Sequence, residues 1–316
     1  MMLRVWVLLW CSSSAVLGAD SIRLVQRIAP GRTTYCEQRW RVSLHTGDPN
    51  SSAVTTELLL GVLQTPRRTD VGTLHLRCVV DRVAVAFDPP LGGRLAADTD
   101  NPGRTPLDEL LQRLVGHGFT VWLDVRQRAV EVRGLEALRA EIDPAWPPMR
   151  LLREVLSEPV VLGWYNSDPQ AALAEGRRVQ EGERWRRQTV RRFVAGARLR
   201  ADFEYHLVRI TSQRGRRGAE LSFTARLEPL DARAVACTLA GGAVLRFDAG
   251  HLEGTARYDA PAARLCRWRM LTTLQWLTAD QAASRVVIVV ETEGRLMSAG
   301  RRRIEKLEQR RETRAP

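Results

Sequence analysis

Long alternation of apolar and polar side chains is the feature that most limits how this chain can fold. The stretch 73–87 places Leu74, Leu76, Cys78 and Val80 at every second position. A period of two matches a β-strand, in which successive side chains point to opposite faces. Further strand-like segments lie at 34–44, 55–64, 118–124, 129–134, 182–194, 201–212, 219–230, 250–259, 264–277 and 285–292. The sequence therefore predicts an α+β fold that is mostly antiparallel β.

Helical spacing is confined to a few short stretches. Apolar residues three and four apart predict a helix from Leu107 to Val115, with Thr105 as the cap before Pro106. A second short helix is expected at 135–142. The proline-rich stretch 144–176 is interpreted as a helical connector between two halves of the chain.

The two halves show corresponding patterns on either side of this connector. Ala29–Arg32 precedes one alternating strand, as Gln180–Glu183 precedes another. Asp124 and Asp259 each come just before a hairpin turn, where an aspartate side chain bonds backbone two residues on. We therefore predict two pseudo-repeated, curved sheet units, with boundaries at 1–19 (signal peptide), 20–143, 144–176, 177–300 and 301–316 (charged tail, weakly helical and frayed).

The N-terminus has the pattern of a cleavable export signal. Arg4 precedes a short apolar run, and small residues follow it up to Ala19. Cys11 leaves a lipoprotein as an alternative, although the bulky Trp10 before it argues against acylation there. A retained anchor is the least favoured alternative, since the run is too short to span a bilayer. We predict a soluble periplasmic or secreted protein.

The basic excess consists almost entirely of arginine. The formal net charge is +12, and Lys306 is the single lysine. The arginines are scattered over alternate strand positions, which favours a solvated outer face over a nucleic-acid or polyanion surface.

Four cysteines remain after loss of the signal, and an even number in an oxidising compartment allows disulfides. We favour the pairs Cys36–Cys78 and Cys237–Cys266, because each lies within one half of the chain. Buried free thiols are the equally weighted alternative.

Tryptophans offer one hint of a ligand. Nine are present, and five of them fall on predicted strands: Trp40, Trp122, Trp185, Trp268 and Trp276. Core packing is the favoured role. If the sheets curve around an unfilled interior, the same residues would line an apolar pocket.

Motifs of catalysis, cofactor binding and metal binding are absent from the sequence. It holds no GxSxG elbow, phosphate-binding loop, GxGxxG motif, HExxH motif or Cys/His cluster. We therefore expect no enzyme, no cofactor and no metal.

Several short motifs together carry a family resemblance. They are Gly31 before a strand, Leu114-Val115-Gly116-His117-Gly118-Phe119, the Asp124 hairpin ending in Val132-Arg133-Gly134, Gly182-Glu183-Arg184-Trp185, and Tyr258-Asp259. With them the chain resembles bacterial exported proteins of the family called domain of unknown function 6263, over nearly its whole mature length. The chain departs from that family at the hairpin turn, where Arg126-Gln127-Arg128 replaces the usual glycine. The resemblance implies an exported β-rich protein and supplies no activity.

Three hypotheses of function follow. The first is a non-enzymatic exported protein that binds an apolar ligand or an envelope partner. The second is an envelope protein that grips anionic polymers or lipid headgroups through arginine. The third is an enzyme with an unrecognised site.

Overall fold

The computed structural model describes residues 20–46, 53–69, 72–89, 92–144, 146–166, 176–192, 198–213, 215–230, 236–238, 244–278 and 285–312. The predicted export signal at 1–19 lies outside these residues, as does the end of the predicted connector at 167–175.

Thirteen of the described strands form one sheet, in which the main path runs β7-β6-β4-β3-β2-β15-β14-β13-β11-β10-β9. Two short strands join it from the side, because β5 pairs with β4 and β12 pairs with β13. The strands are β2 (Thr34–Thr46), β3 (Val54–Arg68), β4 (Leu74–Asp88), β5 (Leu95–Asp98), β6 (Gly118–Leu123), β7 (Ala129–Arg133), β9 (Arg184–Arg192), β10 (Arg198–Gln213), β11 (Arg216–Pro229), β12 (Ala236–Thr238), β13 (Val244–Asp259), β14 (Arg264–Thr278) and β15 (Arg285–Ser298). A separate pair consists of β1 (Ser21–Arg23) and β8 (Arg178–Gln180).

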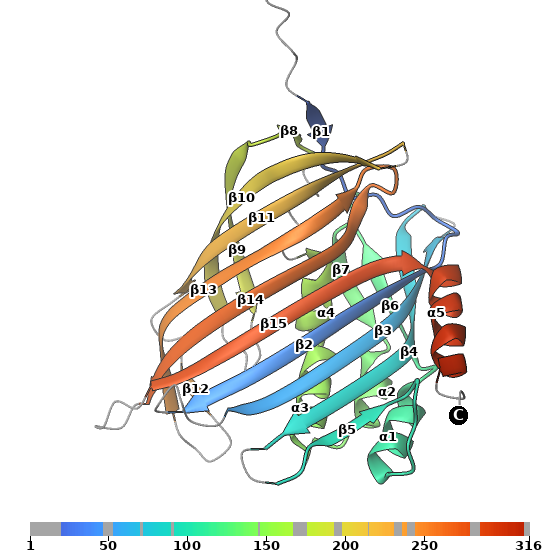
Figure 1. Cartoon of the computed structure of the whole chain (residues 1–316), viewed down its shortest axis with the longest axis vertical. Coiled ribbons are helices and arrows are strands. Elements are labelled where there is room, and N and C mark those ends of the chain that lie inside the picture. The colour runs from blue at the N-terminus through green and yellow to red at the C-terminus, as the bar shows by residue number, and fades with distance from the viewer. Residues whose placement is uncertain are drawn as a thin grey trace, which may run out of the picture.

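The chain enters this sheet at its centre and leaves it there. It runs outward from β2 to the edge strand β7, crosses to the opposite edge at β9, and returns to β15. β15 and β2 pair antiparallel along their length, from Thr46↔Val286 to Thr34↔Ser298. The predicted class, mostly antiparallel α+β, is therefore confirmed. The two predicted sheet units are joined edge to edge into one curved sheet (Figure 1).

Five helices accompany the described strands. They are α1 (Pro106–Leu114), α2 (Leu135–Ala140), α3 (Pro147–Val155), α4 (Glu158–Asn166) and α5 (Ala299–Glu312). Thr105 caps α1 as predicted, because its hydroxyl accepts from the Asp108 N–H and the Asp108 carboxylate accepts from the Thr105 N–H. In Figure 1 α3 and α4 lie behind the curved sheet, and the Trp164 ring on α4 packs 5.9 Å from the Trp40 ring on β2. We call the face that they cover the inner face.

Corresponding turns in the two halves are built alike. Gly31 precedes β2 and Gly182 precedes β9, and both have a φ of 82°. Their N–H groups donate to the carbonyl groups of Pro66 on β3 and Leu207 on β10, respectively. A positive φ is readily adopted by glycine, which explains why the predicted pattern places glycine at both positions.

Large aromatic side chains fill the inner face of the C-terminal strands. The rings of Trp276 and Phe247 meet edge to face with centroids 5.3 Å apart. Trp268 lies flat over Gly294, where an added Cβ would be 2.0 Å from the indole ring. Packing of this kind makes the C-terminal half a dense aromatic core.

The C-terminal segment differs from the predicted frayed tail. Residues 299–312 form α5, which lies beside the ends of β15 and β2 in Figure 1. Its Arg302 side chain is only 3% exposed. The predicted helicity is confirmed, whereas the predicted fraying is wrong for 299–312, because the acidic residues that hold this arginine are more than 200 positions earlier in the chain.

Candidate functional site

A cavity of about 170 Å³ lies between the inner face and α4. Strands β2, β3 and β4 contribute residues to it, and the beginning of β14 and the end of β15 contribute Leu265 and Leu296. Helix α4 adds Trp164 and Tyr165. The N-terminal segment 26–32 completes the wall. We call this space the inner cavity.

Much of the inner cavity wall is apolar. Ile28, Leu76, Trp164, Leu265 and Leu296 line it from five different elements or segments. A concave site with mostly apolar walls and a few placed polar groups is the usual form of a small-molecule site.

Two polar residues of the cavity wall, Gln64 and Tyr165, are hydrogen-bonded to each other, and Tyr165 also contacts Cys78, which lies outside the described lining. Gln64 Nε2 donates to the Tyr165 hydroxyl at 2.8 Å, and Cys78 Sγ lies 3.6 Å from the same hydroxyl. Burial raises the pKa of Cys36 and of Cys78 to about 12. Both thiols are therefore neutral near pH 7, and a neutral thiol is a poor nucleophile.

Three arginines, Arg27, Arg32 and Arg264, line the inner cavity. Its described lining includes no aspartate or glutamate. Arg27 and Arg32 are exposed, whereas Arg264 is half-buried. Burial is the main cause that lowers the pKa of the Arg264 guanidinium, against smaller opposing effects of Asp259 and Cys266.

The segment that carries Arg27 and Arg32 is fastened across the strand ends. The Val25 N–H donates to the Tyr258 hydroxyl at 3.2 Å, and the Arg27 N–H donates to the Ala263 carbonyl at 2.8 Å. The Ile28 N–H donates to Gln127 Oε1 at 2.7 Å. Gln127 has a φ of 59°, so it adopts the left-handed conformation for which glycine is usual. Its side-chain hydrogen bond gives a reason for glutamine rather than glycine at this turn position.

The predicted turn aspartates have the predicted local role. Asp124 Oδ1 accepts from the N–H of Arg126 at 2.8 Å and of Arg128 at 2.9 Å. Desolvation alone would raise the pKa of Asp124, but these hydrogen bonds and Arg128 lower it. Asp259 accepts from the Ala262 N–H at 3.4 Å and pairs with Arg216 at 2.7 Å.

The five predicted tryptophans do not come together at the inner cavity. Trp185, Trp268 and Trp276 belong to the C-terminal core, and Trp40 belongs to the core under α3 and α4. Trp122 stacks at 5.0 Å on His75 and lies under the Arg133 guanidinium. None of the five is among the described lining residues, so the prediction was wrong for this cavity. Trp164, on a helix rather than a strand, is the tryptophan that lines it.

The predicted disulfides are also corrected, because Cys36, Cys78 and Cys266 are free. Strand β3 lies between Cys36 on β2 and Cys78 on β4, so their Cα atoms are at least about 9 Å apart. A disulfide requires less than about 7 Å. Cys237 pairs in register with Leu245, which pairs with Thr278, roughly 40 Å along β14 from Cys266. The alternative of free thiols therefore holds for these three residues.

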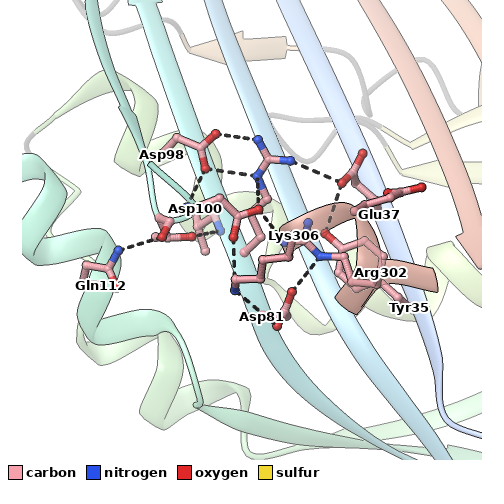
Figure 2. Close-up of polar contacts among 12 residues, drawn as sticks. Tyr35, Glu37, Asp81, Asp98, Asp100, Gln112, Arg302 and Lys306 are labelled. Atoms are coloured by element: carbon pink, nitrogen blue, oxygen red, sulfur yellow. Dashed lines mark hydrogen bonds and ion pairs between the residues drawn. The ribbon is translucent and has the colours of Figure 1, made fainter. Parts of the chain in front are cut away.

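A cluster of charges missed by the sequence reasoning fastens α5 to the outer face (Figure 2). Arg302 Nε lies 3.0 Å from Asp81 Oδ2, and Arg302 Nη2 lies 2.5 Å from Asp100 Oδ2. Lys306 Nζ lies 3.2 Å from Asp100 Oδ1. The Arg302 guanidinium also sits 4.7 Å above the ring of Tyr35. We call these five residues the α5 cluster.

Neighbouring ion pairs extend the α5 cluster over the outer face. Arg82 Nε lies 3.0 Å from Asp98 Oδ1 and 3.2 Å from Asp100 Oδ2. Glu37 pairs with Arg295 at 2.8 Å. Cations and carboxylates alternate in this network, which links α5 to β2, β4 and the end of β5. Its role is to hold the helix in place.

Arginines elsewhere on the outer face pair across strands. Arg209 pairs with Glu220 at 2.7 Å, and Arg269 pairs with Glu293 at 3.4 Å. Arg184 and Arg186 share Glu204. These exposed pairs contribute little stability individually, yet they break up the positive face that a polyanion would need.

Metal-binding clusters and helices of membrane-spanning length are both missing from the described part of the chain. No group of three or more His, Cys, Asp or Glu residues there is arranged to hold a metal ion. None of the described helices is both long enough and apolar enough to cross a bilayer.

No protein-family model matches the chain, and no curated protein matches it. The resemblance to family 6263 therefore stays a prediction. Solved structures similar to the chain include lipovitellin, from a study of lipid–protein interactions in lipovitellin, with 10% identity and a TM-score of 0.48. That match covers 86% of this chain and 26% of lipovitellin, so the chain spans about a quarter of its length.

Two further solved structures are more distant. A DUF1329 family protein from Desulfovibrio piger has 10% identity and a TM-score of 0.16, with 85% of this chain and 86% of that chain covered. A Rh. blastica porin mutant has 8% identity and a TM-score of 0.18, with 83% and 99% covered.

Proposed function

We propose that this chain is an exported, non-enzymatic binding protein that holds an apolar ligand in the inner cavity. The observation that carries the proposal is the cavity itself, with apolar side chains from β4, α4, β14 and β15 around about 170 Å³. The neutral thiol of Cys36, the cysteine among the described lining residues, offers no ready nucleophile there.

The size of the cavity limits what it holds. Apolar protein cavities of about 150 Å³ bind molecules such as benzene, whereas sites for drug-sized ligands are about 300–1,000 Å³. The inner cavity therefore suits a ring, a short chain or one end of a longer molecule. An export signal at 1–19 would bring the protein to such a ligand outside the cytoplasm.

Isothermal titration calorimetry with the neutral probe 1-octanol, whose short chain suits a cavity of about 170 Å³, tests the proposal. We expect saturable binding by the unaltered protein and at least a tenfold loss of affinity in Leu296→Trp, because the indole would fill the cavity. The matched control is Ile288→Trp, on the same strand and the same parity but outside the described lining. Thermal melting establishes that each variant is folded.

A second variant keeps the proposal testable if Leu296→Trp does not fold. Ala262→Phe adds a ring from the turn before β14 rather than from a strand, and it should also weaken probe binding. Equal affinity of the unaltered protein and both cavity variants would contradict the proposal. Native mass spectrometry of protein from its own host would then show whether a protein partner is bound instead.

A further inference from the structure

The charges around the inner cavity are all of one sign. Arg27, Arg32 and Arg264 line it, with no described acidic lining residue to balance them. Several arginines elsewhere pair with carboxylates, as Arg209 does with Glu220 across the outer face. The cavity is therefore a place where described cations gather without carboxylates.

Arg264 is the most constrained of the three cations. It is half-buried at the beginning of β14, and its side chain has no hydrogen bond or ion pair with the described residues. The neighbouring Asp259 is engaged by Arg216 at 2.7 Å. Burial lowers the pKa of the Arg264 guanidinium, and the opposing effects of Asp259 and Cys266 only partly offset it. A bound anion would supply the missing charge.

The charged and the apolar side chains of the inner cavity lie on different sides of it. Arg27 and Arg32 are exposed at the solvent side of the cavity, whereas Leu76 is buried on the inner face of β4. A ligand that satisfies both parts needs an anionic head and an apolar tail. A guanidinium binds a carboxylate or phosphate through two parallel hydrogen bonds.

We infer that the ligand of the inner cavity is an amphiphile with an acidic head, which Arg264 binds together with Arg27 and Arg32 while the tail enters between Leu76 and Trp164. This inference rests on the proposed function, because it assigns a chemical class to the ligand of the same cavity. The shared chemistry is a carboxylate or phosphate on an alkyl chain, either free or as the head of a bilayer lipid.

Isothermal titration with paired ligands tests the inference. Octanoate, octyl phosphate and 1-octanol share one tail and differ in the head. We expect the unaltered protein to bind both acids at least about tenfold more tightly than octanol, as a charge-assisted hydrogen bond allows. Arg264→Met should remove most of this preference by weakening the binding of both acids.

Two further variants separate charge from folding. Arg264→Lys keeps the charge and should retain part of the preference for the acids. Arg267→Met changes an exposed arginine on the same strand, and it should leave all three affinities unchanged. Melting temperatures check that the variants are folded.

The possible failures are distinguishable. Absence of binding for all three ligands would contradict the proposed function itself. Suppose instead that octanol and the acids bind equally well and that Arg264→Met does not change this. The proposed apolar site would then hold, and the inference that its ligand has an acidic head would be refuted.

A vesicle-binding assay distinguishes a bilayer lipid from a free amphiphile as the source of the acidic head. Phosphatidylglycerol vesicles are compared with phosphatidylcholine vesicles in a flotation assay. Capture by the anionic vesicles that Arg264→Met abolishes supports a bilayer lipid as the source. Capture that this variant leaves unchanged counts against a headgroup role for Arg264.

Discussion

Two arginines that are partly or almost wholly removed from water differ in whether a carboxylate pairs with them. Arg302 lies on the outer face with its side chain 3% exposed, between Asp81 and Asp100 and above the Tyr35 ring. Arg264 lies at the inner cavity, half-buried, without a described ion-pair partner. A paired buried charge fastens one element to another. An unpaired one beside a cavity indicates a missing anion.

The largest expected effect on stability is that of changing Arg302, the arginine that pairs with Asp81 and Asp100. Arg302→Ala leaves Asp100 buried without its main partner, and breaking a buried pair in this way costs about 3–5 kcal/mol. Urea denaturation should show this loss of unfolding free energy. Arg303→Ala, exposed one residue later on α5, is the control and should change stability by less than about 0.5 kcal/mol. Similar losses in both variants would mean that the α5 cluster is not what holds the helix.

Acid should produce a smaller loss at the same cluster. Desolvation alone would raise the pKa of Asp100, but Arg302, Lys306 and Arg82 together lower it. Because the folded pKa is below the unfolded value of about 3.9, this contribution is present above that value and is lost as pH falls through the folded pKa. Melting temperature measured from pH 7 to pH 3 should fall more steeply in the unaltered protein than in Asp100→Asn. The control Glu308→Gln, on an exposed part of α5, should keep the steep fall.

The smallest expected effect on stability is that of changing Arg264, the arginine without a described ion-pair partner. Arg264→Met removes a desolvated charge and orphans no described carboxylate, so stability should change by less than about 1 kcal/mol or increase slightly. Urea denaturation without added ligand measures this. A loss as large as that of Arg302→Ala would show that Arg264 has a structural partner, and the comparison between the two arginines would fail.

Local features of the fold were predictable from the sequence. Alternation identified β4 and its neighbours, and Thr105 identified the beginning of α1. The turn roles of Asp124 and Asp259 followed from their position before a hairpin. Each of these features depends on residues within a few positions of one another.

The candidate site was much less predictable. Trp164 lies on helix α4, whereas the sequence pattern points to tryptophans on strands. The pair Cys36–Cys78 follows from the position of both residues in one half of the chain, but that position does not tell which strand lies between two others. The arginines were treated as one population, since composition cannot distinguish Arg264 from a paired surface arginine such as Arg209.

The sequence by itself determined which segments become strands, because a period of two is imposed by the backbone and needs no distant partner. Tertiary structure alone decided the order of those strands and the closing pair β2–β15. It also decided which charges come into contact. Arg302 pairs with Asp100, about 200 positions earlier in the chain, whereas Arg264 lies at the inner cavity, whose described lining has no carboxylate. Such pairings depend on distances in space, and a linear pattern of charges does not contain them.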